Sequence, residues 1–329
     1  MTRKSDLDRE HGIAKAVVLP VLLFVLSSGL AISQVAPAGK SEDQENFRIA
    51  VEVDLVVLQA TVRDRAGHTV AGLGQHDFEV YDDGALQPIR FFRHEDTPVT
   101  IGLVVDHSGS MREKLDQVTG AARAFVQSSN PEDQMFVVNF NEKVSLGLPG
   151  SMRFSSNVDE LGSAIGNSPP AGLTALYDAI VEALQGLRKG EWDKKVLIVI
   201  SDGGDNASHA NLDQVLKLAE QSNAVIYTIG VFDEGDPDRN PRVLRRLAHE
   251  TGGEAVFPSE LSETTEICRR IARDVRDQYT IGYSSIDRKP GSYHKIRVTA
   301  QSGEQGKLSV RTRAGYIAAG NDQTVKDAK

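Results

Sequence analysis

Between residues 97 and 280, continuous apolar segments alternate with amphipathic ones, and this alternation most constrains the fold. The apolar segments, 100–106, 135–140, 195–202 and 224–232, have no polar face. Helical periodicity separates them, at 111–129, 155–165, 173–187, 212–222, 242–253 and 261–277. Strands that are apolar on both faces and alternate with amphipathic helices are typical of a mostly parallel sheet covered on both sides. We therefore predict a doubly wound, Rossmann-like α/β domain over residues 97–280.

The segments on either side of this domain have a different pattern of apolar and polar residues. Residues 47–96 alternate apolar and polar side chains in the manner of strands, with turn chemistry at 64–67 and 82–84. Strand patterns return over residues 281–317, and the tail 318–329 is polar, which predicts disorder. Because isolated hairpins are marginally stable in water, we expect the two β-rich flanks to pair into one β-sandwich-like unit.

The amino-terminal segment indicates export. Basic residues precede an apolar run at 16–26, and the small residues Ala31 and Ser33 follow it. This pattern predicts a signal peptide over residues 1–33, cut after Ser33, and a polar linker over 34–46. An uncleaved membrane anchor is the alternative, and only then would the membrane be a partner. We expect a secreted, periplasmic or cell-envelope protein.

Charge and cysteine content exclude several classes of function. The 329 residues include 37 basic and 46 acidic ones, a net charge of −9, whereas nucleic-acid binders are typically basic. We therefore expect no nucleic-acid partner. The single Cys268 excludes an intrachain disulfide and a multi-thiolate zinc site.

Three predicted loops hold oxygen side chains at the carboxyl ends of strands, where ligands bind in doubly wound sheets. Asp106, Ser108 and Ser110 follow the first apolar strand, Thr174 precedes a helix, and Asp202 ends the strand at 195–202. Carboxylates and hydroxyls without imidazole or thiolate are hard ligands that suit Mg²⁺, with Mn²⁺ or Ca²⁺ as alternatives. We predict a divalent metal site made of these five residues.

These residues resemble the metal-ion-dependent adhesion site (MIDAS) of the von Willebrand factor A-type domain, whose pattern is D-x-S-x-S with a distant Thr and a distant Asp. The flanks are similar to those of a bacterial secreted subgroup of this family. The resemblance implies direct coordination of the metal by the serines and water-mediated coordination by the aspartates. It also implies that Thr174 moves between the first and second coordination shells when the conformation of the domain changes. It also implies an adhesion module that binds the Asp or Glu carboxylate of a partner protein through the metal, without catalysis.

Other interpretations compete with this one. Serine and aspartate also cap helices, but capping does not explain their convergence. Asp106, His107 and Ser108 suggest a catalytic triad, yet sequence neighbours cannot adopt triad geometry, and we expect His107 to face solvent. We expect Asp205 and Asn206 to be solvated loop residues.

Two other functions remain open from the sequence. The chain could be a non-catalytic subunit of a larger envelope enzyme or assembly, or a structural protein whose site holds no metal. The leading hypothesis is a protein-binding module that is not an enzyme.

Overall fold

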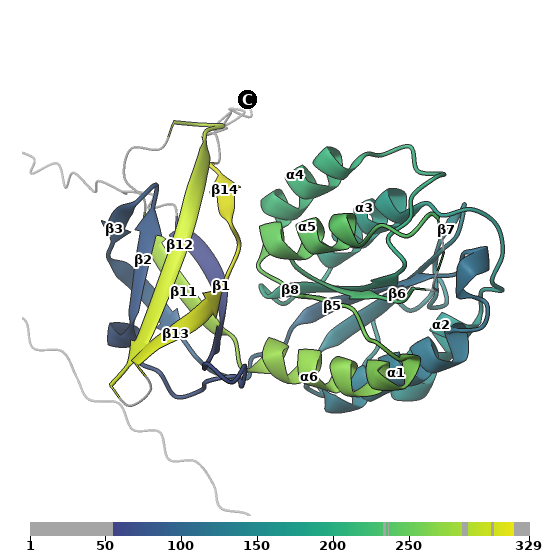
Figure 1. The fold of residues 1–329 in the computed structure, drawn as a ribbon, viewed down its shortest axis with the longest axis horizontal. Helices are drawn as coiled ribbons and strands as arrows, with labels where there is room; N and C mark the ends of the chain where they lie inside the picture. Colours follow the sequence, from purple (N-terminus) through teal and green to yellow (C-terminus); the bar gives the residue numbers. More distant parts are fainter. Residues whose placement is uncertain (1–54, 233–234, 236, 285–288, 304–305, 319–329) are drawn as a thin grey trace, which may run out of the picture. The chain divides into compact units, whose positions relative to one another are not determined.

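A six-stranded sheet forms the centre of the α/β domain in the computed structural model (Figure 1), which describes residues 55–232, 235, 237–284, 289–303 and 306–318. Its strand order is β10-β9-β8-β5-β6-β7. The strands are β5 (Thr100–Asp106), β6 (Gln134–Phe140), β7 (Val144–Leu146), β8 (Lys195–Ser201), β9 (Val225–Gly230) and β10 (Ala255–Val256). All neighbours pair in parallel except β6 and β7. The mostly parallel sheet predicted from the sequence is confirmed.

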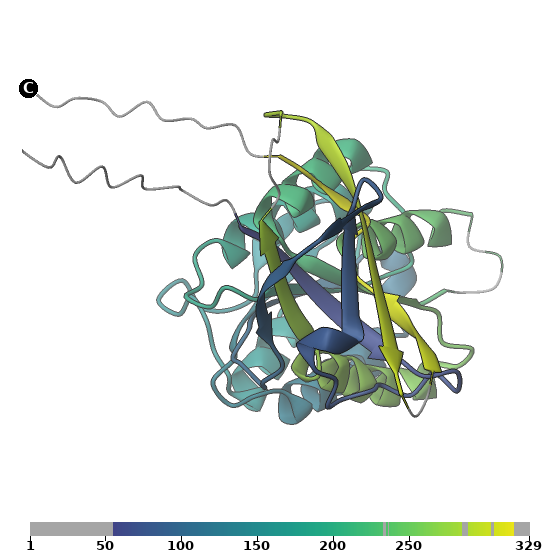
Figure 2. The same ribbon diagram turned by 90° about the vertical axis from the view of Figure 1, so that its left-hand side faces the viewer.

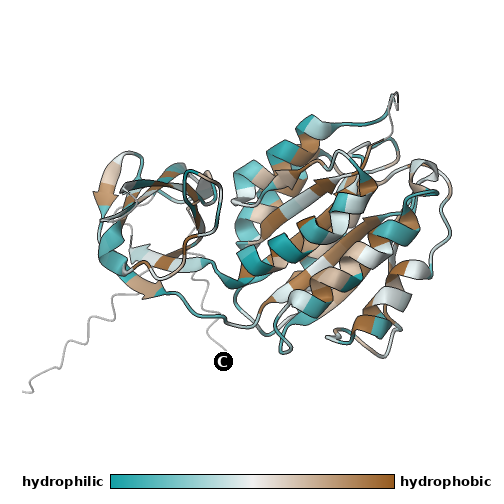
Figure 3. Cartoon of the chain, turned by 60° about the horizontal axis from the view of Figure 1, so that its bottom comes forward, coloured by the Kyte–Doolittle hydropathy of each residue, from teal (hydrophilic) through white to brown (hydrophobic). Residues whose placement is uncertain are grey.

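Helices cover both faces of this sheet (Figure 1). One face carries α1 (Leu115–Ser128), α2 (Val158–Gly166) and α6 (Thr264–Arg276), and the other carries α3 (Leu176–Leu187), α4 (Leu212–Ser222) and α5 (Pro241–Thr251). The strands between them are largely hydrophobic, as Figure 3 shows, and every residue of β5 is buried. This burial on both faces explains the continuous apolar runs in the sequence.

Short 3-10 turns span η1 (Gln75–Asp77), η2 (Gly109–Met111) and η3 (Leu261–Glu263). The last two shift helix starts that were expected from periodicity. Because η2 forms a separate turn, α1 begins at Leu115 and not at residue 111. The chain after β5 is therefore a loop long enough to present side chains at the edge of the sheet.

The remaining strands form a second, antiparallel sheet built from both flanks. They are β1 (Leu55–Arg63), β2 (Phe78–Asp82), β3 (Ala85–Gln87), β4 (Ile89–Arg93), β11 (Tyr279–Ser284), β12 (Tyr293–Ser302), β13 (Gly306–Arg311) and β14 (Gly315–Ile317). Their order is β3-β2-β12-β13-β1-β11-β4, with β14 beside β12. In Figure 2 the blue amino-side strands lie among the yellow-green carboxyl-side strands. We call this sheet the β unit; its assembly from both flanks agrees with the predicted fold class.

Apolar side chains fill the interior of the β unit. Leu58, Val80 and Ile281 are fully buried. The ring of Phe78 lies 5.0 Å from that of Tyr279, centroid to centroid, and 5.4 Å from that of Phe92. The contact with Tyr279 joins strands of the two flanks, which therefore share one apolar interior.

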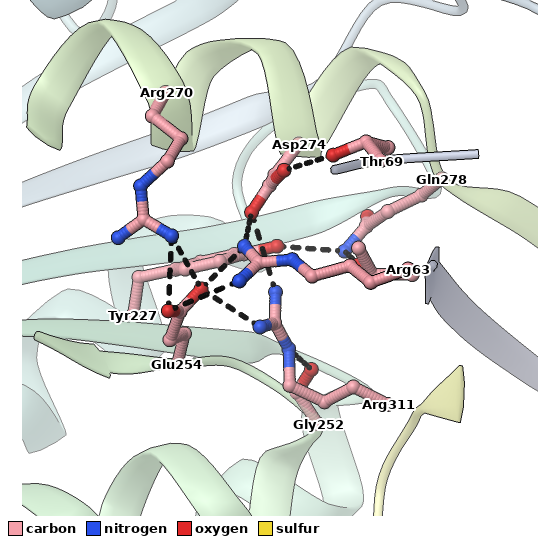
Figure 4. A network of polar contacts seen from close by, with 10 residues as sticks. Arg63, Thr69, Tyr227, Gly252, Glu254, Arg270, Asp274, Gln278 and Arg311 are labelled. Atoms are coloured by element: carbon pink, nitrogen blue, oxygen red, sulfur yellow. Dashed lines mark hydrogen bonds and ion pairs between the residues drawn. The ribbon is translucent and has the colours of Figure 1, made fainter. Parts of the chain in front are cut away.

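Charged side chains connect the β unit to the α/β domain (Figure 4). Arg63, at the end of β1, lies 2.5 Å from Asp274 of α6 and 2.7 Å from Glu254. Arg311 of β13 and Arg270 of α6 also pair with Glu254. Burial raises the pKa of Glu254, but the three arginines outweigh it and hold that pKa below its usual value. We call these five residues the ionic cluster.

Some sequence predictions lie outside the described residues. The signal peptide, the linker and the tail after residue 318 belong to this group. Within the part of the chain that the structure describes, no helix has both the length and the apolar character needed to cross a membrane.

Candidate metal centre

Two of the three predicted site loops leave neighbouring strands of the α/β sheet. Asp106 is the last residue of β5, and Asp202 directly follows β8. The two strands pair in parallel, with Val105 opposite Ile200. Because carboxyl ends of parallel strands meet at one edge, the register places both aspartates at the same edge of the sheet.

Hydrogen bonds connect the oxygen side chains at this edge. The hydroxyl oxygens of Ser108 and Ser110 lie 3.1 Å apart, and Ser110 Oγ donates to Asp202 Oδ2 at 2.6 Å. Asp106 Oδ1 accepts a bond from the backbone N–H of Ser108 at 2.8 Å. The structure therefore brings four of the five predicted residues into one continuous set.

Thr174 reaches the same edge through its backbone. Its N–H donates to Asn206 Oδ1 at 2.8 Å, which ties its loop to the loop after β8. The N–H of Ala171, in the same loop as Thr174, donates to the His107 carbonyl at 2.9 Å and so connects the Thr174 loop to the loop after β5. Thr174 is thus held between the other two loops, whereas no hydrogen bond joins its hydroxyl to the other four predicted residues in the described part of the chain.

The loop before Thr174 depends on a glycine. Gly172 has a φ of +80°, and a Cβ there would collide with the Glu142 carboxylate. That carboxylate accepts a hydrogen bond from the Leu173 N–H at 3.0 Å. Any side chain at position 172 would be strained and would displace Glu142, so the observed path of this loop requires glycine.

Burial dominates the electrostatics of the pair of aspartates. Both Asp106 and Asp202 are almost inaccessible to solvent. Burial raises the pKa of Asp106 to about 6, the charge on Asp202 adds to the increase, and hydrogen bonds from Ser108 and Ser201 oppose it. The site therefore holds two acidic groups whose negative charges are unfavourable in each other's presence.

His107 does not face solvent, so the expectation for this residue is wrong. Its backbone N–H donates to the Phe140 carbonyl at 2.6 Å, which extends the pairing of β5 with β6 by one residue. The side chain is consequently buried, with Nε2 lying 3.2 Å from Asn139 Oδ1. Burial lowers the pKa of His107. The imidazole is thus directed to Asn139.

Three residues that organise the site were not given this role from the sequence. Ser201 Oγ donates to Asp106 Oδ2 at 2.7 Å. Asn206 holds Thr174, as described above, and Asp205 Oδ2 accepts a bond from the N–H of Tyr177 at 2.9 Å, at the start of α3. The expectation that Asp205 and Asn206 are merely solvated is therefore incomplete. The position of Asp205 and Asn206, three and four residues after Asp202 and beyond a Gly-Gly pair, is the signal in the sequence.

The donor set fits a divalent cation. Two carboxylates would balance its charge, and hydroxyl oxygens are neutral hard ligands. A cation held beside Asp106 and Asp202 would also offset the burial of these carboxylates and the repulsion between them, which together raise the pKa of Asp106.

Comparison with known proteins places this domain in a family. The family model for the von Willebrand factor type A domain matches residues 100–270, just over half of the 329 residues. An uncharacterized protein of Borreliella burgdorferi is 24% identical over 223 residues, which are 64% of this chain; the chain thus spans only 64% of that relative's length.

A solved structure shares the fold. A von Willebrand factor type A protein from Catenulispora acidiphila superposes with a TM-score of 0.50 at 12% identity, covering 82% of this chain and 74% of that one. Proximal thread matrix protein 1 from the mussel byssus, with a zinc-occupied MIDAS motif, gives a TM-score of 0.48 at 18% identity, covering 60% and 50%. On the strength of the family match, the chain belongs to the von Willebrand factor type A domain family.

Proposed function

We propose that this chain is a non-catalytic, secreted or envelope-associated module that binds a partner protein in a metal-dependent manner. The observation that carries the proposal is the convergence of Asp106, Ser108, Ser110 and Asp202 into one hydrogen-bonded set at the carboxyl edge of the sheet. Asp106, Ser108, Ser110, Thr174 and Asp202 would hold a divalent cation, with Mg²⁺ the first candidate. Bound there, the cation would supply a positive charge that attracts a carboxylate of the partner.

The protein's own residues prepare this site. Ser201 and the backbone of Ser108 orient the Asp106 carboxylate, and the N–H of Gly204 donates to Asp202 Oδ1 at 2.9 Å. Each aspartate is therefore held in one orientation before any ligand arrives. Such preorganisation lowers the conformational cost of binding.

An apolar side chain beside the site supports a protein partner. Leu173 precedes Thr174, and 54% of its surface is exposed although it is a large hydrophobic residue. Its backbone is fixed by Glu142, so its position at the rim is defined. A carboxylate contact next to an apolar contact is a combination that an acidic residue within a protein surface can satisfy.

The local geometry also favours binding over catalysis. Ser108 Oγ lies beside another hydroxyl, and the neighbouring imidazole of His107 is directed to Asn139. A nucleophilic serine needs a base within hydrogen-bond reach, which this arrangement does not give to Ser108. Export is proposed on the sequence of residues 1–33 alone.

The experiment is a capture assay with the chain beginning at Gln34. The immobilised protein is exposed to envelope extract from the producing cells in Mg²⁺, in EDTA, and in EDTA followed by excess Mg²⁺. We expect a partner that is retained, lost and regained in that order, and that the Ser108→Ala, Ser110→Ala double variant does not retain. Retention that is indifferent to EDTA and to the double variant would contradict the proposal.

A further inference from the structure

A second cluster of ligand-type side chains lies in the β unit, where Asp82 ends β2. The Asp82 side chain is only 3% exposed. Its Oδ2 accepts hydrogen bonds from the hydroxyls of Tyr283 and Tyr316, both at 2.9 Å. Its Oδ1 is buried and accepts no hydrogen bond within the described part of the chain. Burying a carboxylate oxygen without a hydrogen bond costs free energy, so a bound ligand at Oδ1 would stabilise the fold.

His294 of β12 faces this oxygen. Its Nδ1 lies 3.3 Å from Asp82 Oδ1 and 3.1 Å from Asp83 Oδ2. Its Nε2 lies 2.8 Å from the hydroxyl of Ser292, and its ring stacks on Tyr316 with centroids 5.2 Å apart. Ser292 and Tyr316 therefore fix the imidazole so that Nδ1 is directed at the two carboxylates.

Asp83 occupies the turn between β2 and β3. Its φ of +49° is uncommon for a residue other than glycine. Its backbone N–H donates to the Lys295 carbonyl at 2.9 Å, and its Oδ1 accepts the N–H of Lys295 at 2.8 Å. These two bonds attach the turn to β12 and leave Oδ2 as the oxygen nearest to His294.

In all three residues, one polar atom is anchored by the protein and the other points to a common centre. The converging atoms are Asp82 Oδ1, Asp83 Oδ2 and His294 Nδ1, and all lie within 4.8 Å of one another. In a tetrahedral zinc site with bonds of about 2.0–2.1 Å, ligand atoms are about 3.3 Å apart. The two separations measured from His294 are close to that value.

We propose that Asp82, Asp83 and His294 form a zinc site, separate from the metal centre of the α/β domain. An imidazole with two carboxylates suits Zn²⁺ better than Mg²⁺, which prefers all-oxygen surroundings. Tyr283, Tyr316 and Ser292 are the outer partners that orient the ligands, as is usual for zinc sites. The Asp83 side chain is 56% exposed, so the site is accessible to solvent, which would supply water as the fourth ligand.

Binding there would connect strands that are distant in the sequence. Asp82 and Asp83 lie at the β2–β3 turn, His294 on β12, and the two tyrosines on β11 and β14. The metal would thus join the amino-side flank to the carboxyl-side flank. We expect zinc to raise the melting temperature of the protein.

The competing interpretation is an ion pair between a protonated His294 and the two aspartates. A single Nδ1–H donates one hydrogen bond, so it would serve two carboxylates poorly. Both interpretations agree with the distances, and zinc binding separates them.

The test is titration of the full tag-free chain, stripped with chelator, with Zn²⁺ alone, using calorimetry for stoichiometry. We expect Asp83→Asn and His294→Gln each to bind one zinc ion fewer than wild type, or to bind it more than about 100-fold more weakly. Asparagine tolerates positive φ, so Asp83→Asn should fold. Tyr316→Phe, which keeps the ring and removes one hydroxyl, should weaken the same binding about tenfold.

His68→Gln is the matched control, because His68 Nδ1 also lies 3.3 Å from a carboxylate, that of Asp64, but on an exposed loop. We expect this variant, and Asp202→Asn in the other metal centre, to retain the site. Wild-type protein that binds no zinc would overturn the proposal and leave the ion pair. Unchanged zinc stoichiometry and affinity in both Asp83→Asn and His294→Gln would overturn it as well.

Discussion

The hydroxyl of Ser110 donates a 2.6 Å hydrogen bond to the carboxylate of Asp202, although 92 positions separate the two residues. This bond joins the loop after β5 to the loop after β8. Two side chains that each resemble an ordinary helix cap in the sequence therefore belong to one site.

Removing the serine hydroxyls tests whether this set binds metal. We expect the Ser108→Ala, Ser110→Ala double variant to lose Mg²⁺ and Mn²⁺ binding, because in the proposed site both hydroxyls would be direct ligands. The metal-free stability should change little, by about 1–2 kcal/mol, as for loss of a helix cap. Calorimetric titration and urea unfolding check the two expectations. The Ser163→Ala variant on α2 controls for serine loss elsewhere.

The buried charge of Asp106 gives a second prediction. Its pKa is raised to about 6, so the native state binds more protons than the unfolded chain between about pH 4 and pH 6. The metal-free protein should therefore lose stability as pH rises through that window, by up to about 3 kcal/mol. Asp106→Asn should reduce this dependence to the part due to Asp133, whose pKa burial also raises to about 6, and should abolish stabilisation by Mg²⁺. Thermal unfolding across pH 4–8, with EDTA or Mg²⁺, measures both; an unchanged pH profile in the variant would contradict the assignment.

Metal affinity should also depend on the ionisation of Asp106, but it should increase as the pH rises, whereas the stability of the metal-free protein decreases. A cation needs ionised Asp106, so affinity should be full above about pH 6 and fall as the pH drops below it. Titration with Mn²⁺ at several pH values, followed by its paramagnetic effect on water relaxation, gives the midpoint. Affinity that stays constant down to pH 4.5 would show that Asp106 is not involved.

The rim of the site gives a prediction about the partner alone. We expect Leu173→Ala to weaken capture of the partner several-fold and to leave metal affinity unchanged, because only an apolar contact is lost. Leu146→Ala is the matched control, since Leu146 is a similarly exposed leucine on β7 (54% and 56% exposed). Equal effects of the two substitutions would argue against a partner surface at the rim.

The ionic cluster should contribute to stability. Asp274 is buried, pairs with Arg63 and accepts a hydrogen bond from Thr69 at 2.9 Å. Asp274→Ala should lower the free energy of unfolding by about 3–5 kcal/mol, because it removes the buried carboxylate of the cluster and leaves Arg63 and Arg311 to share Glu254. Arg269→Ala, in an exposed pair with Glu266 on the same helix, should cost less than about 1 kcal/mol. Urea unfolding compares them.

Much of the α/β domain was predictable because its signals are local. The strand β8 is apolar on both faces, and such a segment has few alternatives to the middle of a parallel sheet. Once the parallel order is accepted, Asp106 and Asp202 must share an edge. Four of the five predicted site residues then converge without further information.

The features that were missed depend on side-chain partners far apart in the sequence. His107 is buried because β5 pairs one residue further with β6 than the apolar run indicates. The cluster at Asp82 and His294 requires the antiparallel register of β2 with β12, which places Asp82 opposite Ile296. No periodicity within either strand specifies that register, so neither position could be recognised as part of a site.

The central place of β1 in the β unit has a consequence for how the protein is made. Leu58 of β1 pairs with Ile281 of β11, and Val62 pairs with Val310 of β13. A ribosome or an export channel releases the amino-side strand first. The backbone groups along both edges of β1 therefore stay unpaired until the whole α/β domain has been released. A holding chaperone, or rapid folding of the intervening domain, would shield those edges during that interval. The pairing of β11 and β13 with β1 thus acts as a closing step of folding, and loss of these carboxyl-side strands would leave both edges of β1 unpaired.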